Sequence, residues 1–248
     1  MVTLTLALGV NLELVRIPAG EFWMGAELQS YKESPRHRLT LPEYWMGKYT
    51  VTVAQYAAFV QAAGYSTRLG QLDHQSDRPD YPVIYVTWYD AQAFCRWINE
   101  NFLAGHPELA GCQARLPGEA EWEKAARGPD GREYPWGSEN PDETRCNFDK
   151  DMWEITPVGQ YSPLGDSPYG CADMSGNVWE WTHSLNIPYP YRLDDGRENE
   201  HADGERVVRG GAAYSFVGVM RGTYRAENKP DKFFATRGFR MCVSPIYL

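Results

Sequence analysis

The spacing of hydrophobic and polar residues predicts short helices with well-defined ends. Thr52 and Gln55 form a capping box ahead of a one-sided apolar stripe, and Gly64 supplies a left-handed stop. Thr87 and Asp90 begin a second helix in the same way, and its apolar residues again recur on one face. These patterns predict two helices of roughly three turns each.

A third helix is predicted over Glu119–Arg127, with acidic residues in its first turn and basic residues near its end. Short runs bounded by Pro and Gly predict strands at 14–24, 37–48, 207–209 and 239–243, the first two interrupted at Pro18–Gly20 and at Pro42. We find no repeat, low-complexity tract or linker. The pattern therefore predicts one α+β domain over residues 1–248 with much irregular structure.

Composition narrows the function classes. The chain of 248 residues carries a net charge of −9, which argues against nucleic-acid and anionic-membrane binding. Its 9 Trp, 16 Tyr, 9 Phe, 23 Gly and 17 Pro suit a loop-rich fold with large flat side chains in its core. The apolar opening, Val2–Val10, is shorter than the roughly 20 residues of a membrane span and lacks the features of a signal peptide. We therefore expect no membrane span and, by default, a cytoplasmic protein.

The cysteines do not form a recognisable redox or zinc motif. Five are scattered along the chain, at positions 95, 112, 146, 171 and 242, and no pair has CxxC spacing. Cys95 falls on an apolar helix face and Cys242 at a strand end, so both are interpreted as packing residues.

The segment GCADMSGNVWEW, which ends at Trp181, contains a tight turn at Ser175–Asn177. Asp173 and Glu180 flank this turn, and carboxylates with free carbonyls are the ligands that Ca²⁺ takes. The alternative is that Glu180 caps the turn through backbone N–H groups and no ion binds. Trp179 and Trp181 are interpreted as core anchors.

A second oxygen-rich stretch lies at Cys146–Asp151. It offers Asn147, Asp149 and Asp151, although a solvated acidic loop explains the same residues equally well.

Several motifs, taken together and in order, resemble those of formylglycine-generating enzymes, the sulfatase-modifying factors. The resemblance runs from about Glu13 to Val243 and rests on these segments: Phe22–Gly25, Val51–Thr52, Gln55–Tyr56, Arg115–Pro117, Glu119–Ala126, Pro135–Gly137, Asp173–Trp181, Arg209–Gly211 and Gly238–Arg240. It implies a C-type-lectin-like fold, of the sulfatase-modifying-factor type, with short helices and short antiparallel strands.

The resemblance also implies structural calcium. At the first site the ligands would be the side chains of Asp173 and Glu180 with the carbonyls of Gly176 and Val178. At a second site they would be Asn147 and the carbonyl of Phe148, with Asp149 or Asp151 as candidates for the partner acid.

The catalytic elements of the family are missing. Its enzymes use two cysteines, five positions apart, that bind copper as thiolates and precede an Arg and an Asn-x-Pro-Asp run. Here the run is Arg225 followed by Asn228–Asp231, and the cysteine positions fall on Val217 and Gly222. No Cys occurs from 172 to 241, so we expect no catalytic residue of this kind and no copper. Iron-dependent relatives require clustered histidines, whereas the five here are dispersed.

The remaining candidate for function is the segment Ala212–Arg237. It mixes aromatic with small residues, as recognition loops do, and shows no helical or strand period. We predict ligand contacts from Tyr214, Ser215, Phe216, Val219, Tyr224, Phe233, Phe234, Ala235 and Thr236. In some non-catalytic members that this chain resembles, the same segment is the hypervariable face of diversity-generating-retroelement proteins.

Charge is concentrated in the same part of the chain. Residues 206–240 hold eight basic and two acidic residues, a net charge of +6, so the remainder carries −15. Four of the arginines are expected to brace loops and buried acids rather than to bind ligand: Arg209, Arg221, Arg225 and Arg240.

The sequence thus favours a non-catalytic module that binds a protein or small molecule of unknown identity. The alternatives are an enzyme acting on a peptidyl cysteine or another substrate, and a scaffold whose binding surface lies elsewhere, for example in the acidic loop Asp194–Glu205.

Overall fold

The three predicted helices form, and their ends are made as expected. The computed structural model describes residues 1–27, 30–67, 72–151 and 154–245. Thr52 and Thr87 cap α1 (Val53–Ala63) and α2 (Trp88–Asn101) with complete capping boxes. Gly64 ends α1 in the left-handed conformation, and α3 covers Glu119–Arg127. Short 3₁₀ turns lie at Asp73–Gln75 (η1), Leu103–Gly105 (η2), Pro107–Leu109 (η3) and Val217–Val219 (η4).

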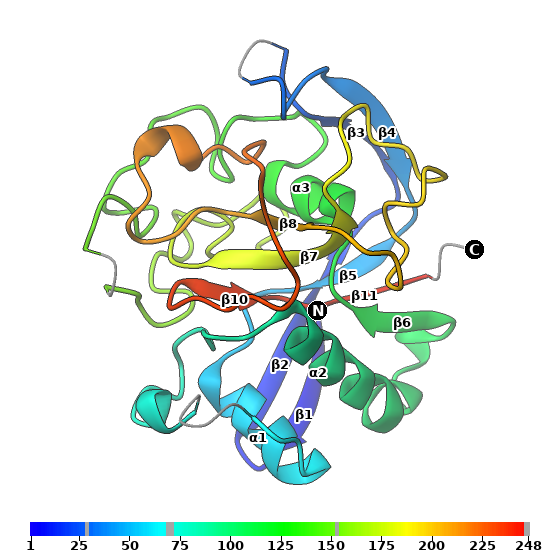
Figure 1. Ribbon diagram of the computed structural model, residues 1–248, viewed down its shortest axis with the longest axis vertical. Coiled ribbons are helices and arrows are strands. Elements are labelled where there is room, and N and C mark those ends of the chain that lie inside the picture. The colour runs from blue at the N-terminus through cyan, green and yellow to red at the C-terminus, as the bar shows by residue number, and fades with distance from the viewer. Residues whose placement is uncertain (28–29, 68–71, 152–153, 246–248) are drawn as a thin grey trace.

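A five-stranded sheet separates two hydrophobic clusters. Its order is β1 (Val2–Ala7), β2 (Val10–Ile17), β5 (Tyr44–Gly47), β11 (Cys242–Pro245) and β6 (Cys112–Arg115). Because side chains alternate along a strand, Val243 and Trp45 pack with α1 and α2, whereas Cys242 and Met46 pack with α3. Figure 1 shows α1 and α2 beside β1 and β2, with α3 in the other half of the molecule.

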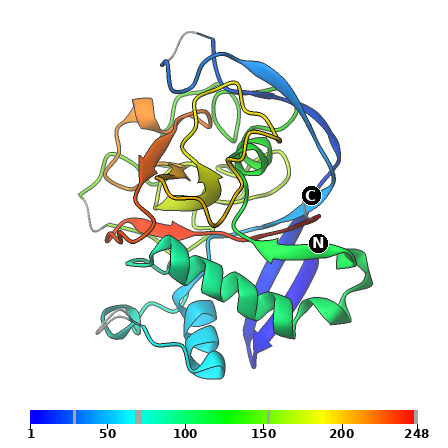
Figure 2. The ribbon, with the colours of Figure 1, turned by 45° about the vertical axis from the view of Figure 1, so that its right-hand side comes forward.

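A second sheet carries the segment of interest. Its order is β10 (Arg237–Phe239), β7 (Trp179–Leu185), β8 (Arg206–Arg209) and β9 (Ala226–Asn228), and β10 runs parallel to β7. A separate hairpin, β3 (Gly20–Met24) with β4 (His37–Leu41), arches beside α3. Turned by 45°, the molecule shows α2 running beneath β10 and β11 (Figure 2). The predicted mixture of short helices and short, mainly antiparallel strands is confirmed.

Four strands were not predicted: β1, β6, β7 and β9. β1 follows a buried and exposed alternation that was assessed only as a membrane or secretion signal. β7 is buried along its whole length although it contains Glu180, Thr182 and Ser184. No helix in the described part of the chain combines the length and the apolar run that a membrane crossing needs.

Candidate functional site

The segment between β8 and β10 is tied to the framework at its start. Ala212 and Ala213 are fully buried, and the carbonyls of Ala213 and Ser215 accept hydrogen bonds from the N–H groups of Lys150 and Asp149 at 2.9 and 3.0 Å. The Ser215 hydroxyl also accepts from the N–H of Ala212 at 3.1 Å. These contacts hold the backbone of the segment and leave the next side chains outward.

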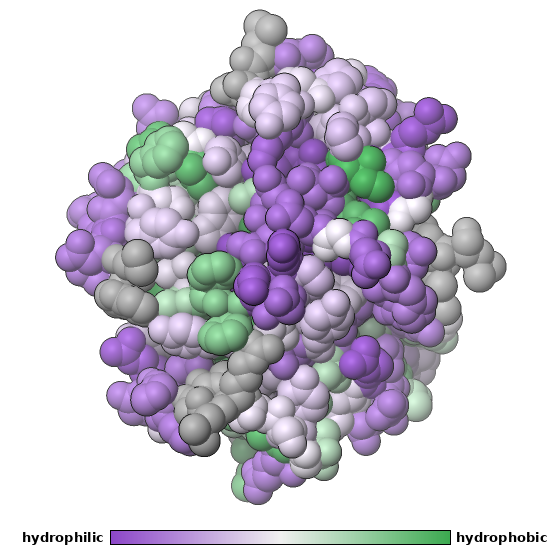
Figure 3. All heavy atoms as spheres, in the orientation of Figure 1, coloured by the Kyte–Doolittle hydropathy of each residue, from purple (hydrophilic) through white to green (hydrophobic). Residues whose placement is uncertain are grey.

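Four large aromatic side chains of this segment are exposed. Tyr214 and Phe216 are 44 and 66% exposed, and Phe233 and Phe234 are 46 and 43% exposed. In Figure 3, two groups of hydrophobic residues lie on the visible face of the molecule, one over η4 and one over the chain that leads into β10. We call these four side chains the aromatic face. Their exposure is what the predicted ligand contacts of Tyr214, Phe216, Phe233 and Phe234 require, and the contacts themselves stay a prediction.

Other predicted contact residues are placed differently. Ser215, Val219 and Thr236 are buried, and Ala235 is half-buried. Tyr224 is half-buried and packs against Trp179, with ring centroids 6.0 Å apart. The prediction that Ser215, Val219 and Thr236 present side chains to a ligand is therefore wrong for the isolated chain. The cause at Val219 is η4, whose three residues per turn point it inward below the exposed Val217.

The four arginines expected to be structural are so. Arg209 donates to Glu119 and Glu123 at 3.0 and 2.7 Å, and Arg225 binds Glu119 at 2.5 and 2.8 Å. The side chains of these two arginines and two glutamates are all buried, and their opposite charges compensate one another. Arg240 pairs with Glu180, and Arg221 with Glu33. Because the ion pairs of Arg209 and Arg225 link α3 to β8 and to the residue before β9, they fix the base from which the aromatic face projects.

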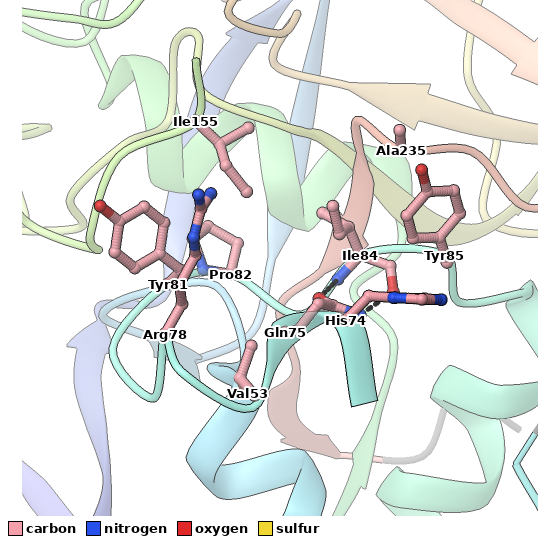
Figure 4. Close-up of a pocket in the computed structure, with 10 residues that line it drawn as sticks. All are labelled: Val53, His74, Gln75, Arg78, Tyr81, Pro82, Ile84, Tyr85, Ile155 and Ala235. Carbon is pink, nitrogen blue, oxygen red and sulfur yellow. Dashed lines mark hydrogen bonds between the residues drawn. The ribbon is translucent and has the colours of Figure 1, made fainter. Parts of the chain in front are cut away.

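A pocket of about 280 Å³ adjoins the face (Figure 4). Apolar side chains make much of its wall, and His74, Arg78, Tyr81 and Tyr85 add polar atoms. The N–H of Tyr85 donates to the carbonyl of Phe234 at 3.1 Å, so the pocket and the aromatic face share this contact. The wall also includes Val53, Gln75, Pro82, Ile84, Ile155 and Ala235.

Tyr85 adopts a strained backbone at this pocket. Its φ is +61°, a conformation that costs a bulky residue on the order of 1–3 kcal/mol. Gln75 holds the preceding residue, because its amide accepts from the N–H of Ile84 at 3.0 Å and donates to the Ile84 carbonyl at 3.2 Å. Strain maintained by a buried clamp is typical of ligand sites. No sequence pattern indicated this pocket, although the run Tyr81–Tyr85 contains part of its apolar wall.

The turn after Asp173 keeps part of the chemistry that calcium needs. Asp173 is buried with φ +54°, its Oδ2 accepts from the N–H of Gly159 at 2.6 Å, and burial raises its pKa to about 6. Glu180 instead binds Arg240 through both oxygens, at 2.6 and 2.7 Å, and Trp122 Nε1 at 2.8 Å. The alternative, in which Glu180 caps the turn through backbone N–H groups, is wrong because these side chains occupy its oxygens.

A calcium ion here would thus depend on Asp173 and on carbonyls. Two carboxylates and one guanidinium leave the turn with a charge of −1, which suits calcium less well than the sequence suggests. Gly176 and Val178 are buried beside the turn, and the described residues hold no group of three or more His, Cys, Asp or Glu placed for a metal. Calcium at this turn stays a prediction.

The second predicted calcium position lies directly against the first. The Asn147 carbonyl accepts from the N–H of Asn177 at 2.9 Å, and the Asn147 amide donates to the Glu154 carbonyl at 2.6 Å. Phe148 is half-buried, whereas Asp149 and Asp151 are exposed. The structure therefore places both predicted sites on one pair of packed loops.

The two positions that the family resemblance assigns to cysteine, Val217 and Gly222, have different surroundings. Val217 is exposed in η4. A Cβ added at Gly222 would lie 2.6 Å from Cγ of Arg127, so a larger residue there requires that side chain to move. Trp179, Trp181, Cys95 and Cys242 are buried, as predicted for packing residues.

Comparison with known proteins supports the resemblance. A family model, the sulfatase-modifying factor enzyme 1-like domain, matches residues 8–245. The formylglycine-generating enzyme of Thermomonospora curvata is 29% identical, over 94% of this chain and 94% of its own length. The hercynine oxygenase of Mycolicibacterium smegmatis is 30% identical, over 94% of this chain but only 61% of its own length.

Two solved structures show the same fold. Treponema denticola variable protein 1 superposes with a TM-score of 0.75 and 21% identity, over 98% of both chains. PvdO from Pseudomonas aeruginosa gives a TM-score of 0.71 with 22% identity, over 93% of this chain and 94% of the other. The fold and the family match thus agree over nearly the whole chain, which belongs to the family of the sulfatase-modifying factor enzyme 1-like domain.

Proposed function

We propose that this protein is a non-catalytic binding module that holds a protein or small ligand on its aromatic face. The observation that carries the proposal is the outward placement of Tyr214, Phe216, Phe233 and Phe234 on a segment anchored by backbone hydrogen bonds. Aromatic rings give a large contact area for little loss of side-chain entropy.

The framework beneath the face favours binding over packing as the role of these rings. A single exposed ring is common on protein surfaces, whereas several exposed apolar side chains on one face are typical of interaction sites. The buried ion pairs of Arg209 and Arg225 fix the segment before any ligand arrives. A preorganised surface loses less conformational entropy on binding, so more of its contact energy becomes affinity.

The cysteine chemistry supports the non-catalytic part of the proposal. Copper of the soft, reduced kind is bound by thiolates. Burial raises the pKa of Cys95 and Cys146 to about 12 and that of Cys171 to about 11, so these side chains stay protonated near neutral pH. Cys242 is shifted in the same direction by burial, with its pKa well above the ordinary value.

A narrower form of the proposal is that the face is diversified by a retroelement. Its support is the fold shared with variable protein 1, together with the exposure of Tyr214, Phe216 and Phe234. The nucleotide sequence of codons 212–237 provides the test. An adenine-rich near-copy beside the gene is expected, and its absence in the genome would contradict this narrower proposal.

Binding itself can be tested without knowing the natural ligand. We expect a displayed library of random linear peptides to yield binders of the wild-type protein that no longer bind a Phe216→Ser/Phe234→Ser variant. Both rings are about half or more exposed, so this variant should lose little of the free energy of unfolding beyond the contact of Phe234 with Arg237. Leu193→Ser is the matched control, because Leu193 is 44% exposed but lies outside the segment. Recovery of no binder, or of binders indifferent to both phenylalanines, would contradict the proposal.

A further inference from the structure

Arg237, the first residue of β10, is a buried cation without an acidic partner. Its side chain belongs to a residue only 8% exposed, and no ion pair includes it among the described residues. Its Nε and Nη1 are buried and have no hydrogen-bond partner there. Arg209, Arg225 and Arg240, which are buried in the same half of the chain, all bind carboxylates.

Aromatic rings enclose the Arg237 guanidinium. Its central carbon lies 4.9 Å from the centroid of Trp181 and 4.7 Å from that of Phe234, which belongs to the aromatic face. Burial lowers the pKa of Arg237 to about 10, and the phenol of Tyr214 is the ionisable group that acts against this shift. The ring contacts offset only part of the desolvation of a charge, whereas a hydrogen-bonded anion would offset much more.

Building on the proposed function, we propose that Arg237 is a carboxylate-binding residue and that the aromatic face takes an acidic peptide segment. The carboxylate pairs with the guanidinium of Arg237, and neighbouring apolar side chains of the peptide contact Phe234 and the adjoining pocket. Reaching the buried nitrogens requires movement of the Phe234 ring, which is 43% exposed.

A carboxylate on a peptide fits this position better than a polyanion does. The planar fork of a guanidinium matches the two oxygens of a carboxylate. A single ion pair between aromatic rings is strengthened by the low local dielectric. The chain as a whole carries −9, which disfavours nucleic acids and other densely charged polyanions.

The pocket beside Arg237 supplies the apolar part of the site. The carbonyl of Phe234 accepts from the N–H groups of both Tyr85 and Arg237, at 3.1 and 3.2 Å, so these residues meet at one peptide group. Figure 4 shows Tyr85 and Ala235 together at one end of the pocket. A peptide that places an acidic residue on Arg237 therefore has an apolar cavity within the same stretch of surface.

Peptide selection on two proteins tests the inference. The random linear library is selected on the wild-type protein and on an Arg237→Met variant, whose side chain fills similar space without charge. We expect Asp, Glu or a free carboxyl terminus to be enriched on the wild-type protein, and this enrichment to vanish on Arg237→Met while apolar residues remain enriched. Arg192→Met, the same exchange at an exposed arginine, is the control and should keep the acidic preference.

Affinities then measure the pairing directly. A selected peptide is compared with its Asp→Asn or Glu→Gln counterpart on the wild-type and Arg237→Met proteins, in a double-mutant cycle. We expect the neutral peptide to bind the wild-type protein about 10- to 100-fold more weakly, because hydrogen bonds to charged groups contribute roughly 1.5–3 kcal/mol. Arg237→Met should bind the two peptides equally. Arg237→Lys, which keeps the charge without the fork, should retain part of the preference.

The outcomes separate this inference from the proposed function. Binders that need Phe216 or Phe234 but show no acidic preference, or a preference that survives Arg237→Met, overturn the inference and leave the binding function standing. Competition by inorganic phosphate as strong as that by acetate would also overturn it, because the site would then accept anions generally. If the library yields no binder that depends on the aromatic face, both proposals fail.

Discussion

Arg240 holds Glu180 in a two-pronged ion pair at the centre of the protein, with nitrogen–oxygen distances of 2.6 and 2.7 Å and both side chains fully buried. The same arginine donates to the carbonyls of Gly47 and Ala172. One residue thereby joins β7, β5 and the start of the Asp173 turn. This explains why the two family motifs that contain Glu180 and Arg240 lie far apart in the chain and together in the fold.

Removing the charge of Glu180 should be costly. Glu180→Gln leaves Arg240 buried with no carboxylate, and losing one partner of a buried pair costs about 3–5 kcal/mol. Urea unfolding at neutral pH measures the loss. Glu43→Gln breaks a similar contact to Arg16 on the surface and is expected to change stability little. Equal effects of the two exchanges would contradict a stabilising role for the buried pair.

In the absence of metal, we expect the stability difference between the wild-type protein and an Asp173→Asn variant to depend on pH. Burial raises the pKa of the Asp173 carboxyl from 3.8 to about 6, so the folded protein favours the protonated form. Ionisation of Asp173 therefore lowers the free energy of unfolding as the pH rises through this range. In a chelator, Asp173→Asn should therefore be more stable than wild type by about 3 kcal/mol above pH 6, and the gap should close by pH 4.

Urea unfolding at the two pH values provides the measurement for Asp173. Asp149 is the matched control, because it shares the left-handed backbone of Asp173 but is exposed. Asp149→Asn is expected to leave the unfolding free energy unchanged. A destabilised Asp173→Asn variant at pH 7 in chelator would show that the charge is stabilised rather than penalised.

Added calcium should nearly close that gap if the predicted ion binds. A ligand at about a hundredfold its Kd stabilises the folded state by about 2.7 kcal/mol. We expect calcium to raise the melting temperature of the wild-type protein, relative to a chelator, and to leave Asp173→Asn unchanged. Identical melting curves for the wild-type protein with and without calcium would exclude a structural ion at this turn.

Two glycines with the same backbone conformation predict different costs of substitution. Gly176 and Gly170 have φ of +88° and +84°, so alanine is strained at both, by about 1–2 kcal/mol. A Cβ at Gly176 would lie 2.2 Å from the carbonyl oxygen of Asn147, whereas at Gly170 nothing lies within 4 Å. Thermal unfolding should show a clearly larger loss for Gly176→Ala. Equal losses would mean that the two loops are not in close contact.

Local chemistry made some elements predictable. Capping boxes at Thr52 and Thr87 depend on residues three positions apart, so the sequence alone was enough to predict where the two helices begin. β7 was not, because its buried polar side chains find partners far away: Glu180 on Arg240, Thr182 on the carbonyl of Val207, and Ser184 on the N–H of Glu119. Such a strand has no alternation to reveal it.

The candidate site was also predictable only in part. Composition identified the segment that carries the exposed rings, and the roles of Arg209 and Arg225 followed from the expectation that arginines brace loops. Which side chains face outward depends on η4 and on hydrogen bonds to residues 149 and 150, which no period in the segment reveals. Arg237 was missed for a related reason, since an unpaired arginine is recognisable only once its neighbours are known.

Oxidation of a peptidyl cysteine is the most direct test of the central claim. The purified protein is loaded with Cu(I) and incubated with oxygen and a cysteine-containing peptide, and the peptide mass is followed, with an active formylglycine-generating enzyme as the positive control. We predict that this protein leaves the thiol unchanged while the control converts it to an aldehyde. Aldehyde formed in proportion to the amount of this protein would contradict a non-catalytic role.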